Sequence, residues 1–130
     1  METEIPKIPA AEWEVLEVLW REPGLTGSEV HERLPRPDRK LKTVNTLLGR
    51  LVERGVLETR RTGKAFRYTP LLEREACVRE ESAGFVRRIL GGQWSPLMLQ
   101  LVEQASLSPS DIAELQDLLE AKKEAQNRKR

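Results

Sequence analysis

The 130-residue sequence has few of the side chains that bind metals or form crosslinks: one histidine, His31, and one cysteine, Cys77. The common His/Cys metal cages need three or four such ligands, and a single cysteine cannot form an internal disulfide. The chain also has no glycine-rich phosphate loop and no evident pair of nucleophile and activating base. We therefore expect no enzyme activity, no metal and no cofactor.

Long hydrophobic runs and aromatic side chains are scarce as well. No run approaches the roughly 18 apolar residues of a membrane span, and the N-terminal METEIPKIPAAEWE lacks the apolar block of a signal peptide. With 33% charged residues and 5% aromatics, the core must be aliphatic and modest in size. We expect a cytoplasmic protein that enters no membrane and forms one small domain, alone or with an attached interaction segment.

Apolar residues at helical spacing predict two helices before residue 36. The first helix carries apolar residues on one face, Trp13, Leu16, Leu19 and Trp20, and glutamates on the others, Glu12, Glu14 and Glu17. Pro23 and Gly24 end it, and a short strand is expected at 25–26. The second helix begins near Ser28, its expected N-cap, and ends at the prolines of LPRPDRK.

The next segment predicts an amphipathic helix over residues 41–54, followed by a β-hairpin over 56–69. The helix has an apolar face, formed by Leu41, Val44, Leu47, Leu48 and Leu51, and Gly55 is suited to end it. In the hairpin, residues alternate with a period of two around a turn at Thr62–Gly63. We expect Phe66 and Tyr68 to face the core.

This order of elements predicts the winged-helix form of the helix-turn-helix, in which helix 41–54 is the recognition helix and the hairpin is the wing. The fold class is mainly α with a small β-hairpin wing. Residues 1–70 form the winged-helix domain, and residues 71–130 form a region of three further helices. Ser95 and Ser108 are the expected caps of the last two helices, and Asp111 completes a capping box with Ser108.

Positive charge gathers on the predicted recognition helix and wing, although the net charge of the chain is only +1. Residues 36–67 contain ten lysines and arginines and three acids, a local excess of seven positive charges. Such a concentration is typical of phosphate recognition, and short polar side chains on a helix can read base edges in the major groove. We expect these residues to contact double-stranded DNA: Lys42, Thr43, Asn45, Thr46, Arg50, Arg60, Arg61, Lys64 and Arg67.

The apolar segments FVRRIL and SPLMLQLV would favour aggregation if they were exposed in a monomer. A single winged helix also covers few base pairs of an operator. Both arguments favour a homodimer on a two-fold symmetric operator. The residues expected at its interface are Phe85, Ile89, Leu97, Leu99, Leu101, Ile112, Leu115 and Leu119. The alternative is that these helices form a second core within one chain.

Four segments in this order resemble the penicillinase-repressor family (BlaI/MecI/CopY type), bacterial repressors with an N-terminal winged helix and a C-terminal helical dimerisation region. AEWEVLEVLW resembles the first helix of the family, and KTVNTLLGRLVERGVL resembles the recognition helix with the following strand. GKAFRYTP is similar to the wing. GGQWSPLMLQLVEQASLSPSDIAELQDLL is similar to the dimerisation helices.

The resemblance implies a dimer that occupies promoter DNA and blocks transcription. In the β-lactam branch, it implies relief of repression by cleavage in the dimerisation region, downstream of a membrane sensor protease. The matching segment LMLQLVE puts that bond at Gln100–Leu101, where the antibiotic-resistance repressors typically have Asn–Phe. Copper sensing is not expected, because no cysteine follows Cys77. Two other functions stay open: an adaptor that binds a protein, and a one-component ligand-responsive regulator.

Overall fold

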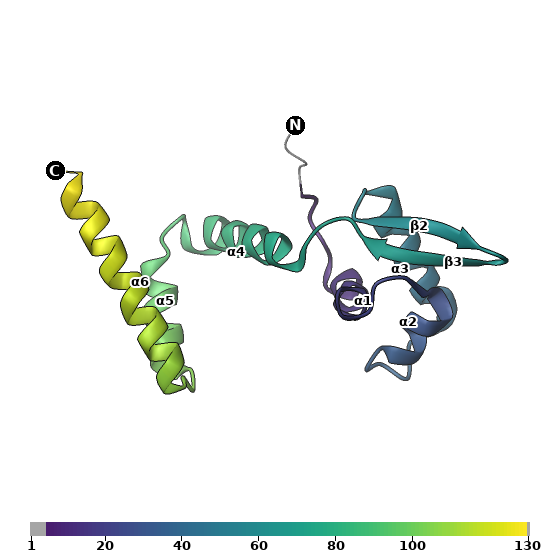
Figure 1. Cartoon of the computed structure of the whole chain (residues 1–130), viewed down its shortest axis with the longest axis horizontal. Helices are drawn as coiled ribbons and strands as arrows, with labels where there is room; N and C mark the ends of the chain where they lie inside the picture. The colour runs from purple at the N-terminus through teal and green to yellow at the C-terminus, as the bar shows by residue number, and fades with distance from the viewer. Residues whose placement is uncertain (1–4, 130) are drawn as a thin grey trace. The chain divides into compact units, whose positions relative to one another are not determined.

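The computed structural model describes residues 5–129, which form six helices and three strands (Figure 1). In chain order these are α1 Ala10–Arg21, β1 Leu25–Thr26, α2 Gly27–Arg33, α3 Leu41–Glu53, β2 Leu57–Thr62, β3 Ala65–Pro70, α4 Arg74–Leu90, α5 Ser95–Gln104 and α6 Pro109–Arg128. The predicted class, mainly α with a small β wing, is confirmed. The chain divides into two compact units at the bond between Phe85 and Val86, inside α4. None of the helices within 5–129 is long and apolar enough to cross a membrane.

The core of the first unit is aliphatic and forms around α1 and α3. Its buried residues are Ile8, Val15, Leu16, Val18, Leu19, Leu25, Val30, Leu34, Val44, Leu47, Leu48, Leu51, Val56, Leu57 and Cys77. The predicted apolar face of α1 was incomplete, because Val15 and Val18 are buried too. Trp13 and Trp20 are only half-buried at the edge of this core, where their rings meet edge to face with centroids 5.4 Å apart.

One glutamate of α1 lies inside this core, contrary to the expectation that all three face solvent. Glu12 is only 2% exposed and forms an ion pair with Arg54, the C-cap residue of α3. Arg54 also donates to the Lys7 carbonyl (3.2 Å) and the Arg50 carbonyl (3.4 Å). A buried carboxylate needs such a partner, because burial removes its hydration. The pair therefore ties the start of α1 and the segment before it to the end of α3.

The N-cap of α2 is Thr26, so the prediction of Ser28 was wrong. The Thr26 hydroxyl accepts from the Glu29 amide (3.2 Å), and the Glu29 carboxylate accepts from the Thr26 amide (2.9 Å). This reciprocal capping box needs a glutamate three residues after the cap, a spacing that Thr26 meets and Ser28 does not. The hydrogen bond from the Thr26 amide is the main cause that lowers the pKa of Glu29.

The wing is a two-stranded hairpin that extends beyond α3, and β1 adds a third, short strand in the order β1-β3-β2 (Figure 1). Thr62 pairs with Ala65, so Gly63 and Lys64 form a two-residue turn. Gly63 has φ +65°, the positive value that such a turn favours. The predicted hairpin is therefore confirmed, with its turn one residue later than expected.

The start of α4 packs on the winged helix, although it lies beyond residue 70, the predicted end of that domain. Cys77 is buried in the first core, and the Trp20 indole donates to the Leu72 carbonyl at 2.9 Å. Arg74 pairs with Glu17 of α1 at 3.0 Å. Burial raises the pKa of the Cys77 thiol, and the nearby Glu81 carboxylate adds to the increase. The first turns of α4 thus complete the first unit.

In the second unit, the expected start of α6 is confirmed and that of α5 is not. The Ser108 hydroxyl accepts from the Asp111 amide (3.1 Å), and Asp111 accepts from the Ser108 amide (3.2 Å). The N-cap of α5 is Trp94, with no side-chain hydrogen bond, because Ser95 is already helical. Gly91 and Gly92 end α4 with positive φ, as their position after the apolar segment predicts.

We predict that Arg54→Met lowers the free energy of unfolding by about 3 kcal/mol, because it leaves the buried Glu12 carboxylate unpaired. Urea denaturation would measure this change. The matched control is Arg36→Met, which breaks the exposed pair with Glu14 (2.9 Å) and should cost less than about 1 kcal/mol. Replacing Glu12 and Arg54 together by methionine should recover most of the loss. Equal losses of unfolding free energy for Arg54→Met and Arg36→Met would contradict a structural role of the buried pair.

Candidate nucleic-acid interface

The exposed side of α3 carries the polar residues that the sequence marks as DNA contacts. Its opposite side is buried through Val44, Leu47, Leu48 and Leu51. Five of the predicted contact residues lie on the exposed side: Lys42, Thr43, Asn45, Thr46 and Arg50. Leu41 was expected to be buried but is 38% exposed, since it begins the helix beyond the edge of the core. The helix thus presents a continuous polar surface on a buried apolar base.

The turn before α3 is held by polar contacts with α1 and α2. The Nε2 atom of His31, on α2, is hydrogen bonded to the Arg39 carbonyl at 2.6 Å. Arg36 and Arg39 both pair with Glu14 of α1, at 2.9 and 3.6 Å. These contacts fix the segment that leads into the N-terminus of α3, where a recognition helix meets the major groove.

Several of the cations in residues 36–67 are neutralised inside the first unit. Arg36, Arg39 and Arg54 pair with glutamates of α1, and none of the three is among the predicted DNA contacts. Lys42, Arg50 and Lys64, in contrast, have no ion-pair partner within residues 5–129. The charge available to an external anion therefore lies on α3 and the wing.

The four predicted contact residues of the wing differ in how far their charges are neutralised by other residues. Arg60 is exposed and lies 4.0 Å from Glu58. Arg67 donates to the Gly24 carbonyl at 3.0 Å and lies 3.5 Å from Glu29, so it is partly neutralised. Lys64 is exposed in the turn, and Arg61 donates from Nε to the carbonyl of Gly63 at 3.0 Å. The free positive charge of the wing is thus concentrated toward its tip.

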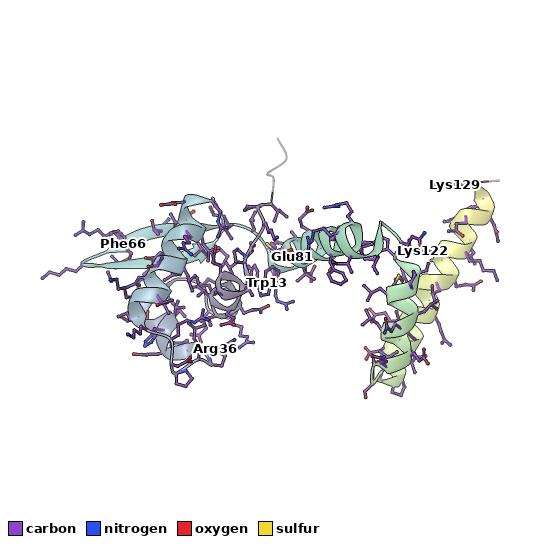
Figure 2. The ribbon with its side chains drawn as sticks, turned by 180° about the vertical axis from the view of Figure 1, so that it is seen from behind. Trp13, Arg36, Phe66, Glu81, Lys122 and Lys129 are labelled. Carbon is purple, nitrogen blue, oxygen red and sulfur yellow. The ribbon has the colours of Figure 1, made fainter. Side chains whose placement is uncertain are left out.

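Phe66 is exposed on the wing, which overturns the prediction that it anchors the hairpin to the core. It shares a face of the sheet with Tyr68, as the period of two predicts, and Tyr68 does pack on the core. The hairpin continues past the core, so Phe66 lies beyond its edge and is 50% exposed (Figure 2). Sequence alternation gives the face of a strand residue but not how far the core extends beneath it.

Two residues of α3 have side chains whose orientation is set by the protein itself. The Thr46 hydroxyl donates to the Lys42 carbonyl at 3.0 Å, which leaves its methyl group and oxygen lone pairs to face a ligand. The Asn45 amide lies against Gly27, the first residue of α2, so closely that a Cβ on Gly27 would overlap the Oδ1 atom of Asn45. Sequence reasoning missed Gly27, because no local pattern identifies a close approach between two helices.

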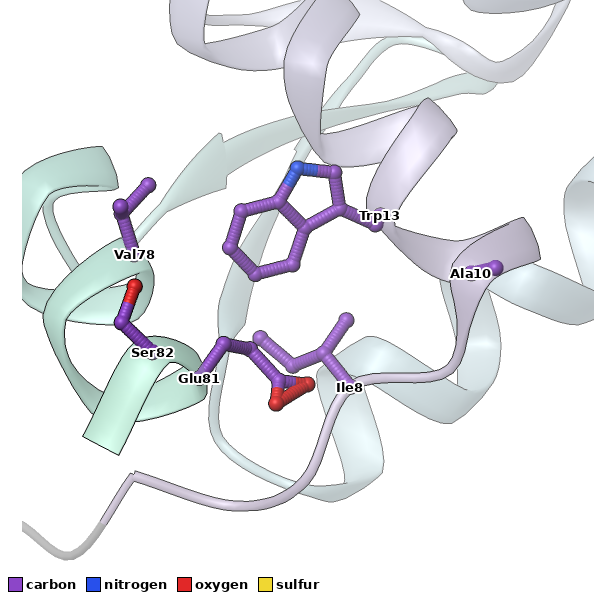
Figure 3. Close-up of a pocket in the computed structure, with 6 residues that line it drawn as sticks. All are labelled: Ile8, Ala10, Trp13, Val78, Glu81 and Ser82. Atoms are coloured by element: carbon purple, nitrogen blue, oxygen red, sulfur yellow. The ribbon is translucent and has the colours of Figure 1, made fainter. Parts of the chain in front are cut away.

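A shallow hollow of about 330 Å³ lies elsewhere on the first unit, between the N-terminal segment, α1 and α4 (Figure 3). It is lined by Ile8, Ala10, Trp13, Val78, Glu81 and Ser82. The Trp13 ring faces this hollow, while its Nε1 atom donates to Glu17 at 2.9 Å. No residue of α3 or of the wing lines it, so it is separate from the polar surface described above.

The predicted dimerisation residues lie mainly on exposed apolar surfaces of α4, α5 and α6. Phe85, Ile89, Leu99, Leu101, Ile112 and Leu119 are exposed, and Leu97 and Leu115 are half-buried. An apolar groove of about 440 Å³ lies between α5 and α6, lined by Met98, Leu99, Val102, Glu103, Leu107, Ile112, Leu115, Gln116, Leu118, Leu119 and Lys122. Gln100 and Leu101 are exposed within α5.

We predict that Gly27→Ala lowers the free energy of unfolding by about 1 kcal/mol, because the added methyl group displaces the Asn45 amide. The same change in an Asn45→Ala background should cost nothing or stabilise, since alanine favours helices more than glycine does. Thermal denaturation of the four proteins without DNA measures this coupling. If Gly27→Ala has the same effect in both backgrounds, the contact between the two residues has no energetic role.

Comparison with known proteins identifies the family of this chain. Residues 8–121 match the family model for the penicillinase repressor. The penicillinase repressor of Bacillus licheniformis is 33% identical over 127 residues, which cover 97% of each protein. The methicillin resistance regulatory protein MecI of Staphylococcus aureus (strain N315) is 29% identical over 123 residues, 94% of this chain and 100% of MecI.

Two solved structures of related proteins cover the N-terminal part. The DNA-binding domain of the repressor BlaI is 34% identical, with a TM-score of 0.49, over 56% of this chain and 90% of that one. The monomeric form of Bacillus licheniformis BlaI in complex with the blaP half-operator is also 34% identical, with a TM-score of 0.47, over 55% and 89%. The match over residues 8–121, with a full-length relative above 30% identity, shows that the chain belongs to the penicillinase repressor family of DNA-binding transcriptional repressors.

Proposed function

We propose that this protein is a homodimeric, sequence-specific repressor that occupies a two-fold symmetric operator in the cytoplasm and has no catalytic activity. The exposed polar surface of α3, on its buried apolar base, is the observation that carries the proposal. A helix of this kind, with short hydrogen-bonding side chains near its N-terminus, suits the major groove. BlaI of Bacillus licheniformis, which shares the N-terminal part, has been solved with a half-operator.

Within this proposal, the residues of α3 and of the wing have different tasks. Thr43, Asn45, Thr46 and Arg50 contact base edges, and Lys42 contacts phosphate at the rim of the groove. Arg60, Arg61, Lys64 and Arg67 bind the backbone or the minor groove beside it. The division follows from chemistry, because phosphate contacts need charge and reach, whereas base readout needs defined hydrogen-bond geometry.

The dimer is proposed to form through the second unit, with a second copy of the chain covering its apolar surface. Thirteen large apolar side chains are exposed in the described residues, and nine of them belong to the second unit: Ile89, Trp94, Met98, Leu99, Leu101, Val102, Ile112, Leu118 and Leu119. So many large apolar side chains are seldom left in contact with water. The groove between α5 and α6 also has a volume suited to a small apolar ligand, which keeps ligand-responsive regulation as a second candidate.

Relief of repression by proteolysis at Gln100–Leu101 is part of the proposal. Both residues lie inside α5, where the backbone is helical and the side chains are exposed. Local opening of a helix precedes most cleavage of folded chains. The upstream sensor protease would therefore act on a transiently opened α5, and the cut would divide the groove between α5 and α6.

We predict that Lys64→Ala weakens binding to all DNA sequences and reduces the slope of log K against log salt concentration by about one unit, because it removes one phosphate contact.

We predict that Arg50→Ala instead costs about 1–3 kcal/mol of operator affinity and reduces discrimination between operator and random DNA. Fluorescence anisotropy at several salt concentrations measures both. Lys123→Ala removes a charge from α6 and is the matched control, expected to keep the wild-type slope. Affinity without salt dependence would favour the adaptor function.

We predict that Leu99→Asp converts the dimer to a monomer without unfolding the first unit, because Leu99 is 72% exposed and lines the groove. The charge would be desolvated at the interface, which is strongly unfavourable. Sedimentation equilibrium and binding to full and half operators are the measurements. Leu71→Asp, at another exposed leucine, should stay dimeric. A monomeric wild-type protein at micromolar concentration would contradict the dimer.

A further inference from the structure

The outer part of the wing pairs an exposed aromatic ring with an arginine. Phe66 on β3 lies directly opposite Arg61 on β2 in the antiparallel register. The Cζ atom of Arg61 lies 5.8 Å from the centroid of the Phe66 ring, within the range of a cation–π contact. Phe66 is 50% exposed, so burial in the core does not explain why an aromatic residue occupies this position.

Arg61 is held in place by two contacts that leave most of its donors free. Its Nε atom donates to the carbonyl of Gly63 at 3.0 Å, and its guanidinium lies over the ring of Phe66. Its two terminal nitrogens have no hydrogen-bond or ion-pair partner within residues 5–129. A guanidinium fixed in this way loses less conformational entropy when it binds an anion.

The position of Phe66 and Arg61, and the charges around them, indicate what kind of partner surface they contact. Phe66 shares its face of the sheet with Leu57 and Tyr68, which pack on the core formed with α1 and α3. The ring therefore projects from the side of the wing that packs on this core. Residues 59–72 contain four cations and no acid. An apolar ring among cations matches a surface of alternating sugars and phosphates better than it matches an apolar protein surface.

We propose that Phe66 packs against deoxyribose at the edge of the operator minor groove, and that it presents Arg61 to the adjacent phosphate as one unit. This inference rests on the proposed DNA-binding function and adds to it a contact that carries no charge. Apolar side chains are known to contact sugars and base steps in minor grooves, and arginines favour narrow ones. The wing thus combines a salt-independent contact with a salt-dependent one.

The test compares Phe66→Ala, Phe66→Leu and Arg61→Ala for binding to an operator duplex obtained by selection from genomic fragments. Phe66→Ala should weaken binding about tenfold and change the salt slope by much less than one unit, because Arg61 keeps its charge and its hydrogen bond to Gly63. Phe66→Leu should recover part of that loss. Arg61→Ala should reduce the slope by about one unit. The double variant should lose less than the two single losses combined, since the ring and the guanidinium bind as one unit.

The matched control is Thr69→Ala, on the same strand but on its other face, which should bind like the wild type. All variants are first compared by thermal denaturation, and because Phe66 is exposed they should melt at the wild-type temperature. Wild-type affinity of Phe66→Ala would overturn the inference while leaving the proposed function intact. A change in its oligomeric state with unchanged DNA binding would also overturn it, and would assign the ring to a protein contact. If the wild type binds no genomic DNA, the proposed function fails first.

Discussion

The structure of the first unit depends on the burial of one face of α3. Four aliphatic side chains of that helix, Val44, Leu47, Leu48 and Leu51, are inserted into the core with α1 and the root of the wing. This apolar contact fixes the rotation of the helix about its axis, and the rotation decides which residues remain exposed. The polar surface of α3 is therefore a direct result of core packing. Because the aliphatic residues are held in the core, the helical period places the polar residues between them on the opposite, exposed side.

The ion pairs with α1 involve arginines that lie away from the exposed surface of α3. Two glutamates of α1 pair with arginines that flank α3: Glu14 with Arg36 and Arg39 before the helix, and Glu12 with Arg54 after it. Among the described residues, Lys42 and Arg50 on α3 and Lys64 in the turn of the wing have no such partner. A nearly neutral molecule thus keeps a local excess of positive charge on this surface, since Glu12 and Glu14 pair with arginines outside it. This arrangement is consistent with the family to which the chain belongs.

Most of the helices and strands could be predicted from the sequence because their signals are local. The helix spacing of α3, the period of two in the hairpin and the capping box at Ser108 each depend on residues a few positions apart. The N-caps of α2 and α5 were missed although their signals are local, whereas the other errors arose where distant residues decide the outcome. Glu12 is buried because Arg54 reaches it from the end of another helix, and Phe66 is exposed because the core ends before the hairpin does. The contact between Gly27 and Asn45 is of the same kind.

The hydrogen bond of Thr46 has a consequence for the chemistry of any DNA site that it meets. Its hydroxyl hydrogen is already donated to the Lys42 carbonyl, so the side chain offers a methyl group where a free threonine would offer a donor. A methyl group at that place fits the 5-methyl group of thymine, and it fits 5-methylcytosine equally well. If Thr46 meets the operator as proposed, a base pair that presents such a methyl group would gain this apolar contact, and one that lacks the methyl group would not.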